Sequence, residues 1–171
     1  MVRSEVKLTW NGNDVIIKAH DWGKKSPYEA GLILMAEAAS LVPADNGQLR
    51  NSLSVQTKEK TKSIGSVTSQ NILRKPTEDE VALVGTNMSY AAATEYGSKP
   101  HMPPVDALKT WAKRHLGSED MAWPLALSIK KKGTKAQPFM RPAFDLTFNR
   151  MLTTFKIVGK QEFKEYFKES V

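Results

Sequence analysis

The residue types that most often do chemistry in proteins are few in this sequence and widely spaced. The 171-residue chain has no cysteine and three histidines, His20, His101 and His115, none with a second His at metal-ligand spacing. No serine-nucleophile elbow, phosphate-binding loop or dinucleotide fingerprint occurs. We therefore expect no catalytic residue, no metal site and no bound cofactor, and predict that the protein is not an enzyme.

Carboxylates are the remaining candidates for chemistry. Residues 78–80 are consecutive acidic residues whose side chains do not converge on one atom, so they predict a solvated loop. Glu95 stands instead in an Ala-rich stretch, residues 90–96, that we expect to be helical and closed by a glycine. It is either an outward-facing polar residue or the buried partner of a cation such as Arg141, and the pair is slightly favoured.

Two clusters of glycine, proline and aromatic residues fix backbone shape on either side of a Trp-bearing helix. The first is residues 90–97, and the second is residues 131–143. Prolines 138 and 142 restrict the backbone and so aim Phe139 and Arg141 in fixed directions. Such rigid anchors suit an assembly interface, but a loop that packs Phe139 into the chain's own core fits at least as well. The candidate interface residues are Tyr90, Glu95, Gly97, Phe139, Arg141 and Pro142.

Local signals in the N-terminal part predict the first elements that position these clusters. Asn11-Gly12, between two apolar-rich runs, predicts a β-hairpin. Residues 26–42 predict a largely buried helix, because Ser26 can cap it, Pro27 suits its first turn and Pro43 follows its end.

Weaker signals follow between this helix and the first cluster. Apolar and polar residues alternate at residues 53–57, and residues 80–85 form a short apolar run, so both predict strands. Residues 58–63 are charged, and residues 64–73 predict only a weak returning strand. We expect residues 58–79 to form a mobile projecting arm, because they lack the apolar residues needed to offset the entropy of ordering.

Three helices are predicted after the first cluster, at residues 104–116, at residues 124–132 and from Pro142 onward. In the last helix an apolar stripe recurs at intervals of four and three, which predicts a packed face. Its members are Phe144, Phe148, Met151, Phe155 and Val158. Because Phe148 is expected to be buried, its substitution by alanine is expected to lower the free energy of unfolding by about 3–5 kcal/mol. Gly159 is expected to end the helix.

These elements together predict one α+β domain over residues 1–171. A small antiparallel sheet is packed by three or four helices, with a loop or hairpin arm projecting at about residues 58–79. Residues 159–171 form a C-terminal extension. The chain is long enough to bury a core of its own.

A net charge of +7 raises the prior for a polyanionic partner. The densest basic cluster, Lys130-Lys131-Lys132 with Lys135, lies at a predicted helix end, where cations favourably meet the helix dipole. A solvated helix end is favoured over a nucleic-acid patch, and direct contact with DNA stays open. The longest apolar run, residues 31–36, is far below the roughly 20 residues that span a bilayer, so no membrane partner is expected.

The same residues give the chain a resemblance to a known family. An ordered series runs through Gly47-Gln48-Leu49-Arg50-Asn51-Ser52, Val84-Gly85-Thr86, Tyr90-Ala91, Glu95-Tyr96-Gly97, Lys132-Gly133-Thr134-Lys135 and Pro138-Phe139-Met140-Arg141-Pro142-Ala143. In this order, over about residues 30–155, it resembles the neck or minor tail-component proteins of long-tailed bacteriophages, called tail-completion or head–tail joining proteins. The Asn11-Gly12 region and the residues after 158 lie outside the pattern.

The resemblance implies a non-enzymatic virion protein, assembled in the cytoplasm of the host bacterium. Such a protein forms a homo-oligomeric ring at the head–tail junction or the top of the tail, with six subunits as the natural number for a tail. Its partners are copies of itself and neighbouring connector or tail proteins. The resemblance carries over no catalytic residue. The alternative function is a small basic nucleic-acid-binding module.

Overall fold

The computed structural model describes residues 12–43, 45, 47–66 and 73–164. In chain order its elements are α1 (Gly12–Leu41), α2 (Gln48–Asn51), β1 (Ser54–Gln56), β2 (Thr61–Ser63), β3 (Leu83–Gly85), α3 (Ala91–Tyr96), α4 (Val105–Leu116), the 3-10 turn η1 (Glu119–Met121), α5 (Ala122–Lys132) and α6 (Met140–Glu162). The described part of the chain is therefore α+β, with a small antiparallel sheet packed by helices, as predicted.

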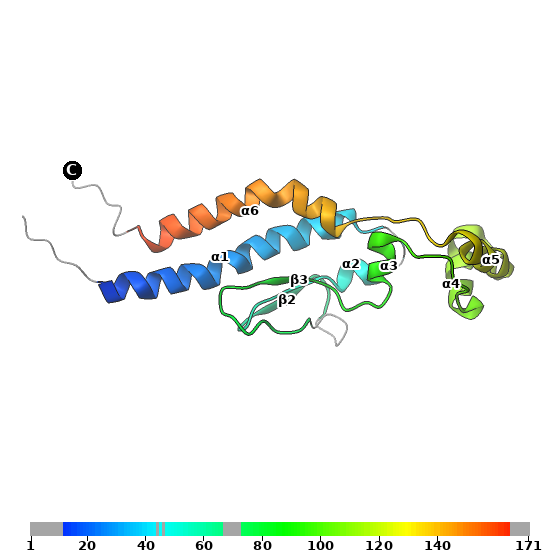
Figure 1. Cartoon of the computed structure of the whole chain (residues 1–171), viewed down its shortest axis with the longest axis horizontal. Coiled ribbons are helices and arrows are strands. Elements are labelled where there is room, and N and C mark those ends of the chain that lie inside the picture. The colour runs from blue at the N-terminus through cyan, green and yellow to red at the C-terminus, as the bar shows by residue number, and fades with distance from the viewer. Residues whose placement is uncertain (1–11, 44, 46, 67–72, 165–171) are drawn as a thin grey trace, which may run out of the picture.

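The long helices α1 and α6 lie side by side, run in opposite directions and make the most extensive contact between any two elements (Figure 1). Side chains buried on α6 are Ala143, Thr147 and Met151, which recur every fourth residue and so share one face. Phe144 and Phe148 are each 46% exposed. The predicted stripe is therefore wrong at these two positions. The residue just before each phenylalanine, Ala143 or Thr147, is buried in its place and has a smaller side chain.

Helix α1 is longer than the sequence predicts. It continues without a break from Gly12 through Pro27, so the hairpin predicted at Asn11-Gly12 and the helix start predicted at Ser26 are both wrong, while its end at Leu41 agrees with Pro43 as the stop. Residues 1–11 lie outside the described residues. Proline within a helix removes one backbone hydrogen bond and costs about 3 kcal/mol, which the packing of α6 along α1 must offset.

Gly159 is a point of close approach between the two long helices, where the sequence predicted the end of α6. The Trp22 indole Nε1 donates a hydrogen bond of 2.9 Å to the Phe155 carbonyl oxygen. A Cβ atom at Gly159 would lie 3.2 Å from that same Nε1. The missing side chain thus lets the Trp22 ring reach the backbone of α6, which continues to Glu162.

The sheet has the strand order β2-β1-β3, with both pairs antiparallel. Central β1 aligns Val55 with Lys62 of β2 and with Val84 of β3. A Cβ at Gly31 of α1 would lie 2.9 Å from Val55 Cγ1, so this glycine lets α1 lie close against the sheet. The strands predicted at residues 53–57 and 80–85 are confirmed at β1 and β3.

Part of the predicted arm is ordered secondary structure. Thr61–Ser63 is strand β2, paired with β1, and the weak strand predicted at residues 64–73 is not found in the described residues of that range. Residues 67–72 lie outside the described residues. The backbone hydrogen bonds of the ladder give β2 a stabilisation that the side chains of this charged segment do not provide.

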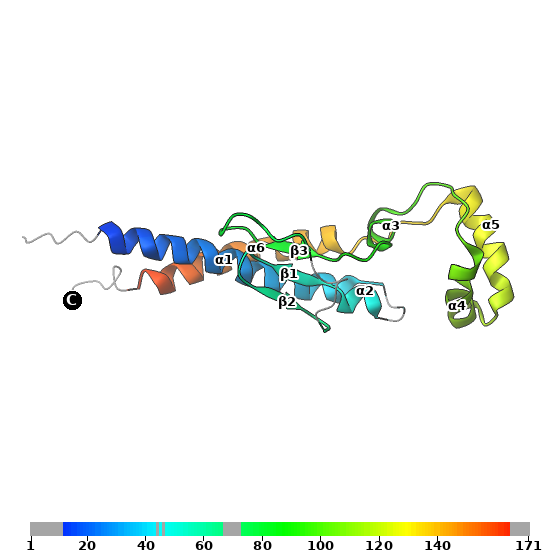
Figure 2. The same ribbon diagram turned by 90° about the horizontal axis from the view of Figure 1, so that it is seen from below.

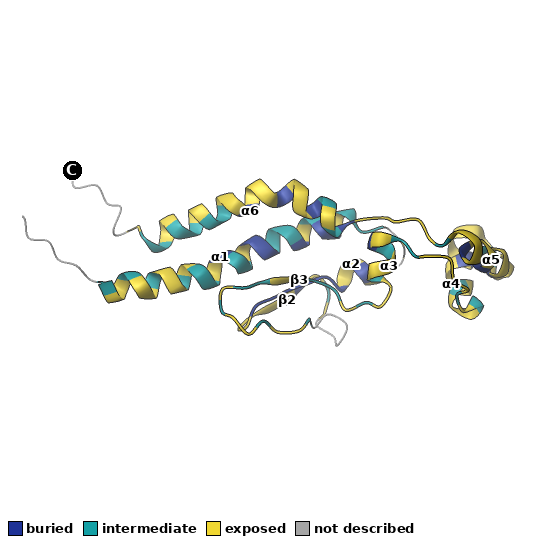
Figure 3. Ribbon diagram, viewed as in Figure 1, coloured by how far each residue is buried: buried dark blue, intermediate teal, exposed yellow. Residues whose placement is uncertain are grey.

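The main core lies where α1, α2, β1 and the start of α6 meet, and Figure 3 shows buried residues gathered there. Its buried members are Met35, Ala38, Ala39, Leu49, Leu53, Val55, Phe139 and Ala143. Helices α4 and α5 form a separate pair beyond the end of the α1–α6 pair, joined to it by two extended segments (Figures 1 and 2). The helices predicted at residues 104–116 and 124–132 are confirmed in this pair.

The burial of α6 predicts a clear order of mutational effects. Met151→Ala should lower the free energy of unfolding by about 2–5 kcal/mol, as expected for a buried methionine. Phe148→Ala should cost about 1 kcal/mol, because roughly half of its side chain already contacts water. Urea denaturation of both variants measures the difference, and a larger loss for Phe148→Ala would contradict the orientation of α6.

Candidate assembly site

The Glu95 carboxylate joins the two sequence clusters. Its Oε2 accepts hydrogen bonds from the backbone N–H groups of Phe139 at 2.7 Å and Met140 at 2.9 Å, and its Oε1 accepts one from Arg141 N at 3.0 Å. These donors start α6 and lack partners within the helix. Glu95 on α3 thus caps a helix more than forty residues away.

The environment of Glu95 keeps its carboxylate ionised. The side chain is only 7% exposed, and this burial raises its pKa, but the three backbone N–H groups outweigh burial and hold the pKa below its ordinary value of 4.5. The positive end of the α6 dipole further suits a negative charge here. The predicted partner of Glu95 was the Arg141 cation; the structure shows the backbone N–H of Arg141 instead.

Two glycines let the two extended segments that lead to and from the α4–α5 pair lie close together. Ser98 and Thr134 form an antiparallel bridge, with both N–H···O distances at 3.2 Å. Gly97 and Gly133 flank the bridge with φ of 74° and 72°. A Cβ at Gly97 would lie 2.5 Å from the Thr134 oxygen, and a Cβ at Gly133 would collide with the Ser98 oxygen. Only glycine fits at both positions.

The other predicted interface residues divide into buried and exposed groups. Phe139 is buried in the main core, which is the alternative that the sequence left open. Pro142 lies in the first turn of α6 and is half-buried. Arg141 and Tyr90 are exposed, and no hydrogen bond or ion pair of the Arg141 guanidinium is found with the described residues. Of the candidate set, Arg141 and Tyr90 are therefore the side chains that an approaching subunit can reach.

Asp45 ties the α4–α5 pair to the rest of the chain. Its carboxylate lies 3.0 Å from Arg114 Nη1 and 3.0 Å from His115 Nε2, both near the end of α4. Beside it, a hollow of about 200 Å³ is lined by Tyr90 and Trp111 among others. Although Tyr90 is 40% exposed, the partial burial of its side chain raises the pKa of its hydroxyl, and the charge of Asp45 adds to the effect.

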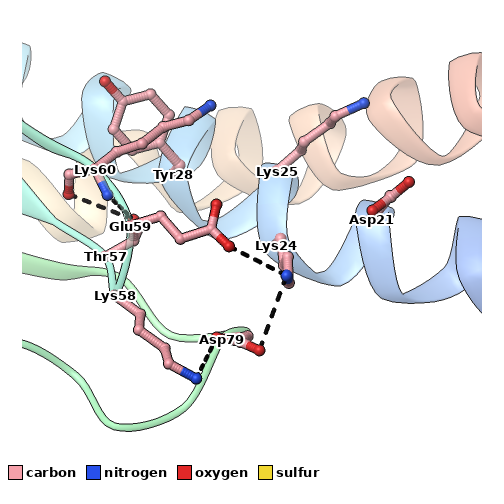
Figure 4. Close-up of a pocket in the computed structure, with 9 residues that line it drawn as sticks. All are labelled: Asp21, Lys24, Lys25, Tyr28, Thr57, Lys58, Glu59, Lys60 and Asp79. Atoms are coloured by element: carbon pink, nitrogen blue, oxygen red, sulfur yellow. Dashed lines mark hydrogen bonds and ion pairs between the residues drawn. The ribbon is translucent and has the colours of Figure 1, made fainter.

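A second hollow, of about 170 Å³, lies between α1 and the β1–β2 turn, and Figure 4 shows that charged side chains line it. Lys24 Nζ lies 3.2 Å from Glu59 and 3.9 Å from Asp79, while Lys58 Nζ lies 2.9 Å from Asp79. The hydrogen bond from Lys58 lowers the pKa of Asp79. Because these cations already have anionic partners, the cluster ties the sheet to α1 and is a poor ligand site.

Sequence patterns missed one surface, a groove of about 510 Å³ between α1 and α6. Its lining is Glu29, Leu32, Ile33, Ala36, Glu37, Ser40, Arg150 and Thr154. The α1 residues recur at alternating intervals of three and one, which marks one helix face, but only the structure shows that α6 leaves this face partly uncovered.

The described residues contain no group of three His, Cys, Asp or Glu side chains placed to hold a metal ion. Among them, no helix combines the length and the apolar character needed to cross a membrane.

Comparison of the chain with protein-family models, with curated proteins and with solved structures gives no match in any of the three.

The Glu95 cap makes a stability prediction with a defined pH dependence. Glu95→Ala should cost about 2–3 kcal/mol, because three backbone N–H groups lose a charged acceptor. Glu95→Gln should cost about 1 kcal/mol, because it keeps an acceptor but loses the charge.

The sign of the pH effect follows from the lowered pKa. A carboxyl group whose folded-state pKa lies below its unfolded value contributes its full stabilisation above about pH 4.5, and this is lost as the pH falls through the folded pKa. The unfolding free energies of wild type and Glu95→Gln should therefore converge at acid pH. A difference that stays constant from pH 7 to pH 3 would contradict the ionised cap.

Glycine substitutions test the bridge between the two extended segments. Gly133→Ala should destabilise the chain more than Gly117→Ala. Both residues have positive φ, which costs a non-glycine residue about 1–2 kcal/mol, but a Cβ at Gly117 meets no atom within 4 Å. The larger loss of unfolding free energy in Gly133→Ala should be accompanied by faster amide exchange at Ser98 and Thr134. Equal losses of unfolding free energy in the two variants would argue against the bridge.

Proposed function

We propose that the protein is a non-enzymatic virion assembly subunit of a long-tailed bacteriophage. In this proposal, copies of the chain form a ring, six being the expected number, at the head–tail junction or the top of the tail. The ring contacts neighbouring connector or tail proteins and is assembled in the host cytoplasm before it becomes part of the virion.

The observation that carries the proposal is the convergence of the ordered motifs on one junction. Ser52 Oγ of the first motif lies 2.6 Å from Thr86 Oγ1 of the second. Glu95 of the fourth motif caps the helix that the last motif begins. Leu49 and Phe139, from the first and last motifs, belong to the same core cluster. Motifs that resemble the tail-completion proteins therefore support one another in space.

The shape and surface of the chain also support an assembly role. The molecule is elongated, with a helix pair held beyond its body (Figure 2). Many large apolar side chains are exposed on α4, α5 and α6, among them Leu116, Trp123, Leu127, Phe144 and Leu152. Contiguous exposed apolar patches mark protein–protein contact sites, and the half-exposed rings of Phe144 and Phe148 lie side by side on α6, with their centroids 5.6 Å apart.

A second candidate function is a small basic nucleic-acid-binding module. Residues 98–135 carry eight Lys or Arg residues and three acidic ones, and Trp123 in this segment is more than half exposed. Binding of this kind weakens steeply as salt concentration rises, since it depends on released counterions.

One experiment separates the two functions. The purified chain is examined by native mass spectrometry and negative-stain microscopy, and its binding to a DNA duplex is measured from 50 to 300 mM salt. In parallel, the gene is disrupted in a phage that encodes it. Rings, together with separate heads and tails in the lysate, are the expected result. A monomeric chain that binds DNA with a steep salt dependence, and whose loss leaves joined particles, would favour the alternative.

Arg141→Glu tests the predicted interface. We expect the variant to fold as the wild type does, because its side chain is exposed, but to form rings or joined particles at least tenfold less efficiently. Exposed Arg74, in the segment before β3, provides the matched control Arg74→Glu.

Far-UV circular dichroism, melting temperature and complementation of a disrupted phage are the measurements. Loss of folding in Arg141→Glu would assign the residue an internal role. Full complementation would show that Arg141 has no part in assembly.

A further inference from the structure

The groove between α1 and α6 has the features of a site for a helix. Its apolar lining residues are Leu32, Ile33 and Ala36, and Glu29 and Glu37 also line it. Arg150 Nη1 lies 3.8 Å from Glu37 Oε2 and contributes the one cation of the lining. A groove of about 510 Å³ lined by both apolar residues and carboxylates suits a helix that presents apolar anchors flanked by lysines.

The outer face of α5 has that composition. Trp123 is 56% exposed and Leu127 is 42% exposed, and Lys131 follows at the next interval of four. Side chains four residues apart lie above one another on a helix, so these three form one stripe. The opposite side of α5 is already occupied, because Ala122, Ala126 and Ile129 are buried within the helix pair. The stripe therefore faces away from its own unit.

A single chain does not bring these two surfaces together. The groove is lined by residues of α1 and α6 alone. Figures 1 and 2 both show α5 beyond the end of the α1–α6 pair, and the Ser98–Thr134 bridge fixes the segments that lead to it. An α5 stripe that occupies the groove must therefore belong to another copy of the chain.

We propose that the α5 stripe of one copy docks into the α1–α6 groove of the next copy. This inference rests on the proposed ring and names the contact that closes it. Trp123 and Leu127 cover Leu32, Ile33 and Ala36, while Lys131 approaches Glu29. The two surfaces are different patches of the same chain, so the contact is head-to-tail, which is the type of contact that generates rings. Each copy then uses its stripe once and its groove once.

The absence of native cysteine makes a site-directed cross-link the cleanest test. Chains carrying Leu127→Cys and chains carrying Ala36→Cys are mixed and oxidised, and disulfide-linked dimers are quantified on non-reducing gels. Leu152→Cys is the matched control partner for Leu127→Cys, because Leu152 is 46% exposed and does not line the groove. We expect the Leu127–Ala36 pair to cross-link at least fivefold more than the Leu127–Leu152 pair.

A charge swap tests the same contact without a covalent bond. Lys131→Glu and Glu29→Lys should each reduce ring yield several-fold, and a chain carrying both changes should recover it. Far-UV spectra and melting temperatures check that each variant folds. A double variant no better than the single ones would contradict the proposed pairing of Lys131 with Glu29.

The outcomes separate this contact from the proposed function. Wild-type rings with equal cross-linking of the two pairs would overturn the docking of α5 and leave the assembly role intact. A wild-type chain that is monomeric and absent from particles would overturn the ring and the contact together. If Lys131→Glu abolishes binding to a DNA duplex while ring yield is unchanged, the stripe serves nucleic acid and the proposal is wrong.

Discussion

Three backbone N–H groups at the start of α6 have no carbonyl partner within the helix, and the Glu95 carboxylate accepts all of them. This contact holds α3 against the first turn of α6. Phe139 is thereby kept in the core with α1, α2 and β1. The same contact brings together the two ends of the segment 97–138, because Glu95 precedes this segment and Phe139 follows it. The α4–α5 pair projects from the place where these two ends meet.

Sequence signals that act over a few residues, such as a glycine at the end of a helix, predicted the structure well, because the conformation of the local backbone alone decides whether they apply. Gly117 and Gly133 follow the last residues of α4 and α5, and both have the positive φ that favours glycine. The errors arose where a distant partner overrides a local preference. Pro27 lies inside α1 because α6 supports that helix, and Gly159 continues α6 because Trp22 packs against it.

The candidate site was partly predictable for a related reason. Residue types and spacing indicated that Glu95 meets the segment around Arg141, and the structure shows this meeting. The bonding atoms could not be predicted, because the donors are backbone N–H groups, which every non-proline residue carries. The phenylalanine stripe of α6 failed because apolar spacing alone does not distinguish a face packed against α1 from one left open beside it. For the same reason the groove was not foreseen.

The α4–α5 pair buries little apolar surface of its own. Its buried apolar residues are three alanines and one isoleucine, Ala112, Ala122, Ala126 and Ile129, which let the helices approach closely but remove little apolar area from water. Helices of 12 and 11 residues are too short to be stable alone in water. A neighbour that covers Trp123 and Leu127 would add the burial that the pair lacks, since any partner that binds the folded form stabilises it. Under the proposed contact, each subunit that joins a ring therefore stabilises the α4–α5 pair of the neighbour whose stripe enters its groove. Folding of the α4–α5 pair is then coupled to growth of the ring.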